Sequence, residues 1–173
     1  MNIIYSDEYL PPFYKDTLIN NEHELITNIN SIYSNGIFLC GPTPRDKKTI
    51  SWRKEAIKLF EKYNSNITLF IPERKDWSVK FDYYDQINWE LTAISRVEKI
   101  MFWVPRNLEN MPGFTTNVEF GYTIGLDEKN IYYGRPHNAP KIKYMDYLYN
   151  LYFEREIFND LEEMVKEICT NVK

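Results

Sequence analysis

Short apolar runs recur along the chain, and most of them end at a glycine, a proline or a polar turn. Runs of this kind, rich in Ile, Leu and Phe and without polar alternation, are typical of strands buried on both faces of a sheet. The pattern predicts strands over residues 2–5, 36–40, 67–71, 99–104 and 131–133.

Between these runs the apolar residues recur at spacings of three and four, which predicts amphipathic helices. One helix is expected to begin at Ser51, whose hydroxyl is a candidate N-cap. Others are predicted over about 83–96, over 118–126 and over the tail 147–172. The expected buried stripe of the second helix is Ile87, Leu91 and Ile94. Residues 13–35 are polar and Asn-rich, and they predict a loop or a short helix.

Strands that alternate with helices at this spacing imply parallel pairing and right-handed crossovers. The sequence therefore predicts a single doubly wound α/β domain over residues 1–173, of the Rossmann or flavodoxin-like kind. Its sheet has four or five mainly parallel strands with helices on both faces. Residues 1–35 form the N-terminal strand and loop, and 147–173 form the C-terminal helix.

Composition narrows the possible partners and the compartment. A net charge of -4 argues against binding to a nucleic-acid polymer, which requires a basic face. The two cysteines, Cys40 and Cys169, lie far apart and share no metal-ligand spacing, so we expect free thiols in a reducing compartment. We find no signal peptide and no apolar run long enough for a membrane span, so we expect a cytoplasmic protein with no membrane partner.

The first candidate site is the segment 41–45, Gly-Pro-Thr-Pro-Arg, which follows a predicted strand and precedes a helix. Backbone N–H groups beside a helix N-terminus, together with Arg45 and Arg53, could hold a phosphate or another polar group. The pattern lacks the Gly-Lys-Ser/Thr ending of a phosphate-binding loop. The alternative is a rigid proline turn with a solvated arginine.

A second candidate is Glu90, which lies three residues after Ile87 and four before Ile94 and so borders the buried stripe of its helix. Trp89 would form an aromatic wall beside it. The alternative is an ordinary surface glutamate on an amphipathic helix.

The third candidate is Glu119, within the segment 112–121 that follows the apolar run 99–104. A Gly- and Thr-rich loop at the carboxyl end of a parallel strand is a usual place for a ligand site. If its carboxylate faces the cleft, Glu119 is a candidate nucleophile or general base, whose pKa a neighbouring carboxylate such as Glu90 and partial burial would raise. The alternative is a capping box, because Thr116 to Glu119 matches Ser/Thr-x-x-Glu.

These segments together resemble the nucleoside 2-deoxyribosyltransferase superfamily. The similarity covers about residues 36–136 and is carried by the motifs GPTPR at 41–45, SWR at 51–53 and PGFTTNVEFG at 112–121. It also takes in Pro72-Glu73, Trp89-Glu90 and the run 102–106.

The resemblance implies that Glu119 attacks the anomeric carbon of a 2′-deoxynucleoside, and that Glu90 contacts the sugar or the base. The family carries an aspartate six residues before the nucleophile, and Gly113 stands there in this chain. Thr115 or Asn117 is the candidate substitute in orienting the substrate.

A carboxylate beneath the anomeric carbon can trap the sugar as a glycosyl ester, which a second nucleophile releases. This chemistry requires no metal and no redox cofactor. Glu90 is the candidate acid for the leaving base, and Gly41 and Pro42 are expected to line the same cleft. The candidate stacking residues for the base are Trp89, Trp103 and Phe114.

Three functions remain open from the sequence. The first is transfer of 2-deoxyribose from a nucleoside to a free base, and the second is hydrolysis of nucleoside 5′-monophosphates by an N-glycosidase. The third is a non-catalytic nucleotide-binding module, which Gly113 favours. The resemblance also implies a homodimer or larger homo-oligomer, for which the aromatic segment 144–153 offers a surface.

Overall fold

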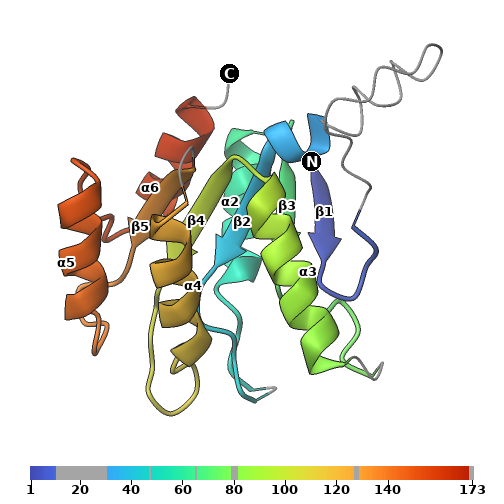
Figure 1. The fold of residues 1–173 in the computed structure, drawn as a ribbon, viewed down its shortest axis with the longest axis horizontal. Coiled ribbons are helices and arrows are strands. Elements are labelled where there is room, and N and C mark those ends of the chain that lie inside the picture. The colour runs from blue at the N-terminus through green and yellow to red at the C-terminus, as the bar shows by residue number, and fades with distance from the viewer. Residues whose placement is uncertain (11–30, 47, 65, 79–81, 127–128, 172–173) are drawn as a thin grey trace.

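The computed structural model describes residues 1–10, 31–46, 48–64, 66–78, 82–126 and 129–171. Its sheet has five strands, all parallel, in the order β1-β3-β2-β4-β5. The strands are β1 (Asn2–Tyr5), β2 (Gly36–Cys40), β3 (Thr68–Ile71), β4 (Lys99–Trp103) and β5 (Asn130–Gly134). The predicted doubly wound α/β fold is therefore confirmed (Figure 1).

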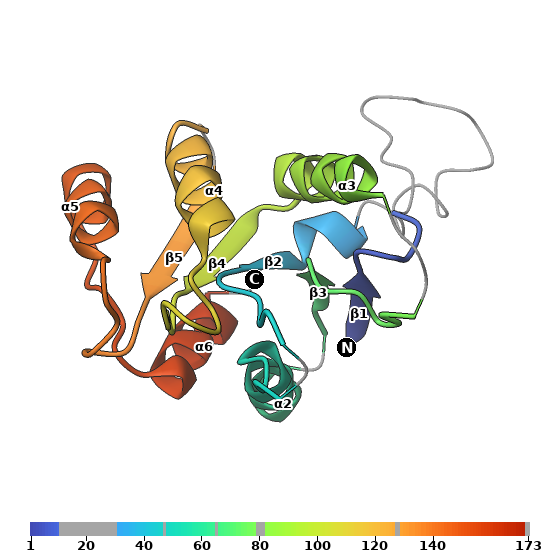
Figure 2. The same ribbon diagram turned by 90° about the horizontal axis from the view of Figure 1, so that it is seen from below.

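Helices cover both faces of the sheet (Figure 2). On one face lie α3 (Tyr83–Arg96), α4 (Phe114–Ile124) and α5 (Lys143–Tyr152), and on the other lie α2 (Arg53–Tyr63) and α6 (Leu161–Thr170). The helices on each face bury a separate apolar core against the sheet. None of the described helices combines the length and apolar composition that a bilayer span requires.

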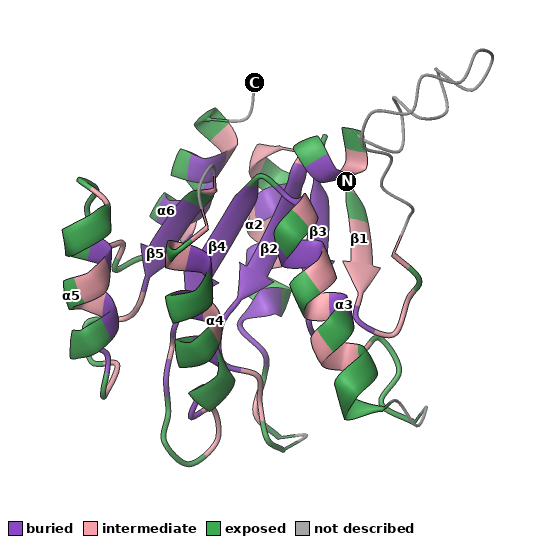
Figure 3. Ribbon diagram, in the orientation of Figure 1, coloured by how far each residue is buried: buried purple, intermediate pink, exposed green. Residues whose placement is uncertain are grey.

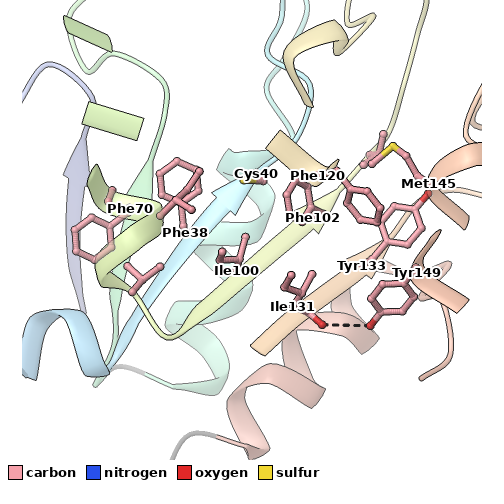
Figure 4. Packing of buried hydrophobic residues seen from close by; sticks show 14 of the residues in the cluster. Phe38, Cys40, Phe70, Ile100, Phe102, Phe120, Ile131, Tyr133, Met145 and Tyr149 are labelled. Atoms are coloured by element: carbon pink, nitrogen blue, oxygen red, sulfur yellow. Dashed lines mark hydrogen bonds between the residues drawn. The ribbon is translucent and has the colours of Figure 1, made fainter. Parts of the chain in front are cut away.

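The central strands β2, β3 and β4 are buried along their whole length, as their continuous apolar runs predict (Figure 3). Under α4 and α5 the core is aromatic. The centroid of the Phe120 ring lies 5.0 Å from that of Phe102, in an edge-to-face arrangement, and 5.1 Å from that of Tyr133. In the same cluster the buried Tyr149 hydroxyl donates to the Ile131 carbonyl at 3.3 Å (Figure 4).

Three expected elements differ from the structure. The tail predicted as one helix over 147–172 contains two helices, because residues 153–160 leave the helix and Phe158 bridges to Gly134 at the sheet edge. The stripe predicted for α3 is wrong at Leu91, which is exposed, whereas Trp89 and Ala93 are buried with Ile94. Most of the predicted loop or short helix over 13–35 lies outside the described residues.

Candidate active site

The site is built where the chain leaves β2 and β4, two neighbouring strands whose following loops turn to opposite faces of the sheet (Figure 2). Parallel α/β proteins bind ligands at such a switch point. The loops approach closely at Gly41, where φ is 151° and an added Cβ would lie 2.2 Å from the Trp103 carbonyl oxygen. Glycine is therefore required at this crossing.

Helix α4 begins at Phe114, four residues earlier than the hydrophobic pattern predicts. Its N-cap is Gly113, in the left-handed conformation at φ 61°, and no side chain caps the helix. Glu119 consequently lies in the second turn, too far along the helix for the predicted capping box with Thr116. The capping-box interpretation is wrong, because the chain turns into the helix before Thr116.

Helical spacing separates the side chains of α4. Thr116, Phe120 and Thr123 are buried against the sheet. At 100° per residue, Asn117 and Glu119 then project from opposite flanks of this buried row. Asn117 accepts a hydrogen bond from the Arg106 guanidinium, which also contacts the Met145 sulfur at 3.7 Å on the α5 side.

The Glu119 carboxylate lies on the α3 side, near Glu90. Both residues are partly buried, and both carboxyl groups are desolvated. The pKa of the Cys40 thiol at the end of β2 is raised by burial and further by the charges of Glu119 and Glu90. The charges of both carboxylates therefore act at the end of β2.

The two carboxyl groups have different surroundings. Desolvation raises the pKa of Glu119 to about 7, with the negative charge of Glu90 adding to the rise and Arg53 opposing it. Desolvation also raises the pKa of Glu90, against a 3.0 Å hydrogen bond from the Gln86 amide and the charge of Arg53. In the folded protein both acids therefore bind a proton more tightly than a free glutamate does.

Arg53, at the first turn of α2, fixes the loop after β2. Its buried guanidinium donates to five acceptors: the carbonyls of Leu39, Gly41 and Pro42, the Thr43 hydroxyl and the Glu73 carboxylate. The bond to Glu73 is 2.7 Å long, and the Ser51 hydroxyl donates to the same carboxylate oxygen at 2.6 Å. All three of its nitrogens donate to the protein, so the phosphate contact that the sequence suggested for Arg53 stays a prediction.

The sequence model of a family described as "nucleoside 2-deoxyribosyltransferase like" matches residues 34–137, which is more than half of the chain. The chain belongs to this family. No match is found among curated proteins. The matched region contains the crossing loops, Arg53, Glu90 and Glu119, whereas β1, α5 and α6 lie outside it.

The structure brings some of the predicted family site residues together. Pro42 packs against Gly113, where an added Cβ would lie 2.9 Å from the proline Cγ. Arg45 lies over the exposed ring of Phe114 at 5.3 Å, and its backbone N–H donates to the Asn110 carbonyl. Thr115 is exposed at the start of α4. These residues occupy the same edge of the sheet as Glu119.

Other predicted site residues lie apart from Glu119. Trp89 is buried, with its indole N–H donating to the Glu8 carbonyl at 3.1 Å and its ring 6.1 Å from Phe38. Trp103 is buried in the core beneath α2 and α6, on the opposite face of the sheet. Asn117 is held by Arg106 on the far flank of α4. For these three, a role in binding the substrate stays a prediction.

Two charged residues beside the site, Glu73 and Arg106, belong to segments that carry the resemblance, but the sequence alone gave them no role. Glu73 follows Pro72 directly after β3, so an acid at the carboxyl end of a strand was the available signal. Arg106 follows β4 in the same way and is buried, with a 2.6 Å bond to the Lys141 carbonyl. Only the fold reveals that their partners come from distant segments.

Proposed function

We propose that this protein cleaves the N-glycosidic bond of 2′-deoxynucleosides through a glycosyl ester at Glu119 and transfers the sugar to another base. The observation that carries the proposal is the Glu119 carboxylate beside Glu90 at the switch point. Within the described part of the chain, no donor is hydrogen-bonded to Glu119. Its oxygens are therefore available to a substrate rather than committed to the fold.

In the first step a Glu119 oxygen forms a bond to the anomeric carbon as the bond from that carbon to the base nitrogen breaks. The bonding electron pair leaves with the base, and Glu90 supplies a proton to it. In the second step a nitrogen of the incoming base attacks the same carbon and releases the Glu119 carboxylate. A proton from the incoming base restores Glu90. Two displacements at one carbon retain its configuration.

The reactive form carries one proton on the pair, placed at Glu90 with Glu119 ionised. Desolvation raises the pKa of both acids, so the folded protein keeps a proton on the pair to a higher pH than a free glutamate would. The rate should therefore fall as the pH rises through about 7, where the pair loses this proton. Replacing Glu90 by Gln should remove that alkaline limb and lower the rate about tenfold, most strongly for poor leaving bases.

The proposal is tested by incubating the protein with deoxyinosine, with and without adenine, and with deoxyinosine 5′-monophosphate. New deoxyadenosine in the presence of adenine supports transfer. Hypoxanthine release from the monophosphate alone would instead identify an N-glycosidase. Absence of turnover together with nucleoside binding would favour the non-catalytic module. Mass spectrometry after rapid acid quenching should locate the sugar ester on the peptide that contains Glu119.

One observation bears on the binding-module alternative. At Gly113 the left-handed backbone and the 2.9 Å approach to Pro42 leave no room for the aspartate that the family carries. An orienting carboxylate therefore has to come from another position if the chain is an enzyme. Glu90 is the acidic candidate, because its charge already acts on Glu119.

We also propose assembly into a homodimer or a larger homo-oligomer through the outer faces of α4 and α5. Both helices carry exposed apolar residues at helical spacing, and they lie on the same face of the sheet. The residues are Phe114, Val118, Tyr122, Tyr144, Tyr147 and Leu151. Exposed apolar residues gathered on two helices of one face are candidates for an interaction site. Light scattering should give a multimer that Tyr147→Lys dissociates, and a monomeric parent would refute the assembly.

A further inference from the structure

Within the described part of the chain, one hydrogen bond reaches the carboxyl group of Glu90. The side-chain amide of Gln86, one helical turn earlier in α3, donates to its Oε1 at 3.0 Å. Residues four apart lie on the same face of a helix, so α3 itself brings the two side chains together. Both residues are partly buried, which limits competition from water. Gln86 is therefore the group that fixes how this carboxyl group is turned.

A second acceptor sets the orientation of the Gln86 amide. Its Nε2 also donates to the Pro72 carbonyl, 3.3 Å away. A primary amide nitrogen carries two hydrogens, so it can serve both acceptors at once. The Pro72 carbonyl cannot donate, and it would repel the amide oxygen. The nitrogen of Gln86 therefore faces Glu90 whether the carboxyl group is protonated or ionised.

The Pro72 carbonyl is itself held in place. Pro72 follows β3 directly, and the carboxylate of the next residue, Glu73, is fixed by Arg53 and Ser51. The Glu73 carbonyl also accepts the backbone N–H of Ser6 at 3.1 Å. Gln86 thus ties Glu90 to a loop that is bonded both to α2 and to the segment after β1.

This bridge decides which oxygen of Glu90 carries a proton. In a protonated carboxyl group the hydroxyl oxygen is the donor, and the carbonyl oxygen is left as the acceptor. Because Oε1 accepts from Gln86, the proton is placed on Oε2. Among the described residues, no group is hydrogen-bonded to that second oxygen, so it is available to a leaving base.

The other ionisable groups around Glu90 come from three elements. Its charge raises the pKa of Glu119 on α4 and of the Cys40 thiol at the end of β2. Desolvation raises the pKa of Glu90, and both the Gln86 bond and the charge of Arg53 on α2 oppose that rise, the Gln86 bond more strongly. Removing the Gln86 donor should therefore raise the pKa of Glu90 further.

We propose that Gln86 is a positioning residue of the active site, whose amide holds Glu90 with its hydroxyl oxygen turned toward the departing base. This inference rests on the proposed function, in which Glu90 protonates that base. Gln86 acts through Glu90 and does not touch the substrate. Its contribution should therefore be largest when the leaving base needs a proton.

The activity test compares two substrates. Deoxyinosine needs a proton as hypoxanthine departs, whereas 7-methyl-2′-deoxyguanosine already carries a positive charge on its base and needs none. Gln86→Met keeps the length of the side chain and has no N–H donor. It should lower kcat for deoxyinosine about fivefold more than kcat for the methylated substrate, and change KM by less than about twofold. The alkaline limb of the deoxyinosine profile should move to higher pH. Equal losses with both substrates would show a merely structural role and overturn the proposal.

Asn88→Met is the matched control, because Asn88 is an exposed amide of the same helix and is not hydrogen-bonded to Glu90. This variant should keep the ratio of the two substrates and the pH profile of the parent. A departure as large as that of Gln86→Met would overturn the specific role of Gln86.

A titration without turnover separates this inference from the proposed function. The carboxyl carbon of Glu90, labelled with carbon-13 and assigned by its loss in Glu90→Gln, is followed by NMR as the pH is varied. Its midpoint should lie about 0.5 pH unit or more higher in Gln86→Met than in the parent, and should not move in Asn88→Met. A parent that cleaves neither nucleoside would overturn the proposed function, whereas an unshifted titration in Gln86→Met would overturn the inference about Gln86 itself.

Discussion

Two acidic side chains on either side of the loop after β2 have opposite surroundings. Glu73 accepts short bonds from Arg53 at 2.7 Å and from Ser51 at 2.6 Å. Glu119 is desolvated beside another carboxylate, and its pKa rises to about 7. The ion pair stabilises the charged form of Glu73 and supports the fold. Within the described part of the chain Glu119 has no such partner, so its oxygens stay available for chemistry.

Arg53 acts on both Glu73 and Glu119. It bonds directly to Glu73, and at longer range its charge lowers the proton affinity of both Glu119 and Glu90. A single buried cation therefore holds the loop in place and limits how strongly the two free acids retain protons. The following predictions separate these effects.

The largest expected effect is on activity. Glu119→Gln should lower base exchange and nucleoside hydrolysis about a thousandfold or more, because an amide cannot form the glycosyl ester. The measurement is turnover of deoxynucleosides at equal folded concentration. Because Glu73→Gln removes the paired acid and leaves the nucleophile in place, it should retain far more activity than Glu119→Gln. Similar losses in both variants would contradict the division of roles.

The next effect is on stability. Arg53→Ala should lower the free energy of unfolding by about 3 kcal/mol, because it leaves the Glu73 carboxylate without its charged partner and removes the arginine donor to the Leu39 and Gly41 carbonyls. Urea unfolding measures this. The double variant with Glu73→Gln should lose less than the sum of the two single changes. Strict additivity would show that the pair is not coupled.

A smaller effect concerns the pH dependence of stability. The folded-state pKa of Glu119 is raised from 4.5 to about 7, so the native state binds its proton more tightly than the unfolded state does. Stability should therefore fall as the pH rises from 4.5 to 7, on the order of 2 kcal/mol for this group. Glu119→Gln should lack this fall and be more stable than the parent at pH 8. If the free energy of unfolding depended on pH in the same way in both proteins, Glu119 would not be a buried, unpaired acid.

The smallest effect tests how α4 presents Glu119. Gly113→Ala should destabilise the fold by about 1 kcal/mol or more, because alanine is strained at φ 61° and would meet Pro42. Gly121→Ala is the control in the same helix, where an added Cβ meets nothing within 4 Å. That change should stabilise the helix by about 0.5–1 kcal/mol. Thermal unfolding of both variants shows whether the two changes have opposite signs.

Local patterns predicted the sheet well, because strands buried on both faces must be apolar throughout. The runs at 2–5 and 36–40 match β1 and β2 at both ends. The patterns failed where long-range contacts decide the boundary. Helix α4 begins early because Gly113 turns the chain against Pro42, and the tail is divided where Phe158 joins the sheet edge.

The sequence by itself determined the fold class, the family and the candidate acids, because apolar runs and motif order are properties of the chain. Only the tertiary structure decided which side chains share a site. It placed Asn117 and Glu119 on opposite flanks of one helix and buried Trp89 and Trp103 in the core. It also paired Arg53 with Glu73, twenty residues further along the chain. Such pairings depend on crossovers and on the depth of burial, which spacing along a chain does not encode.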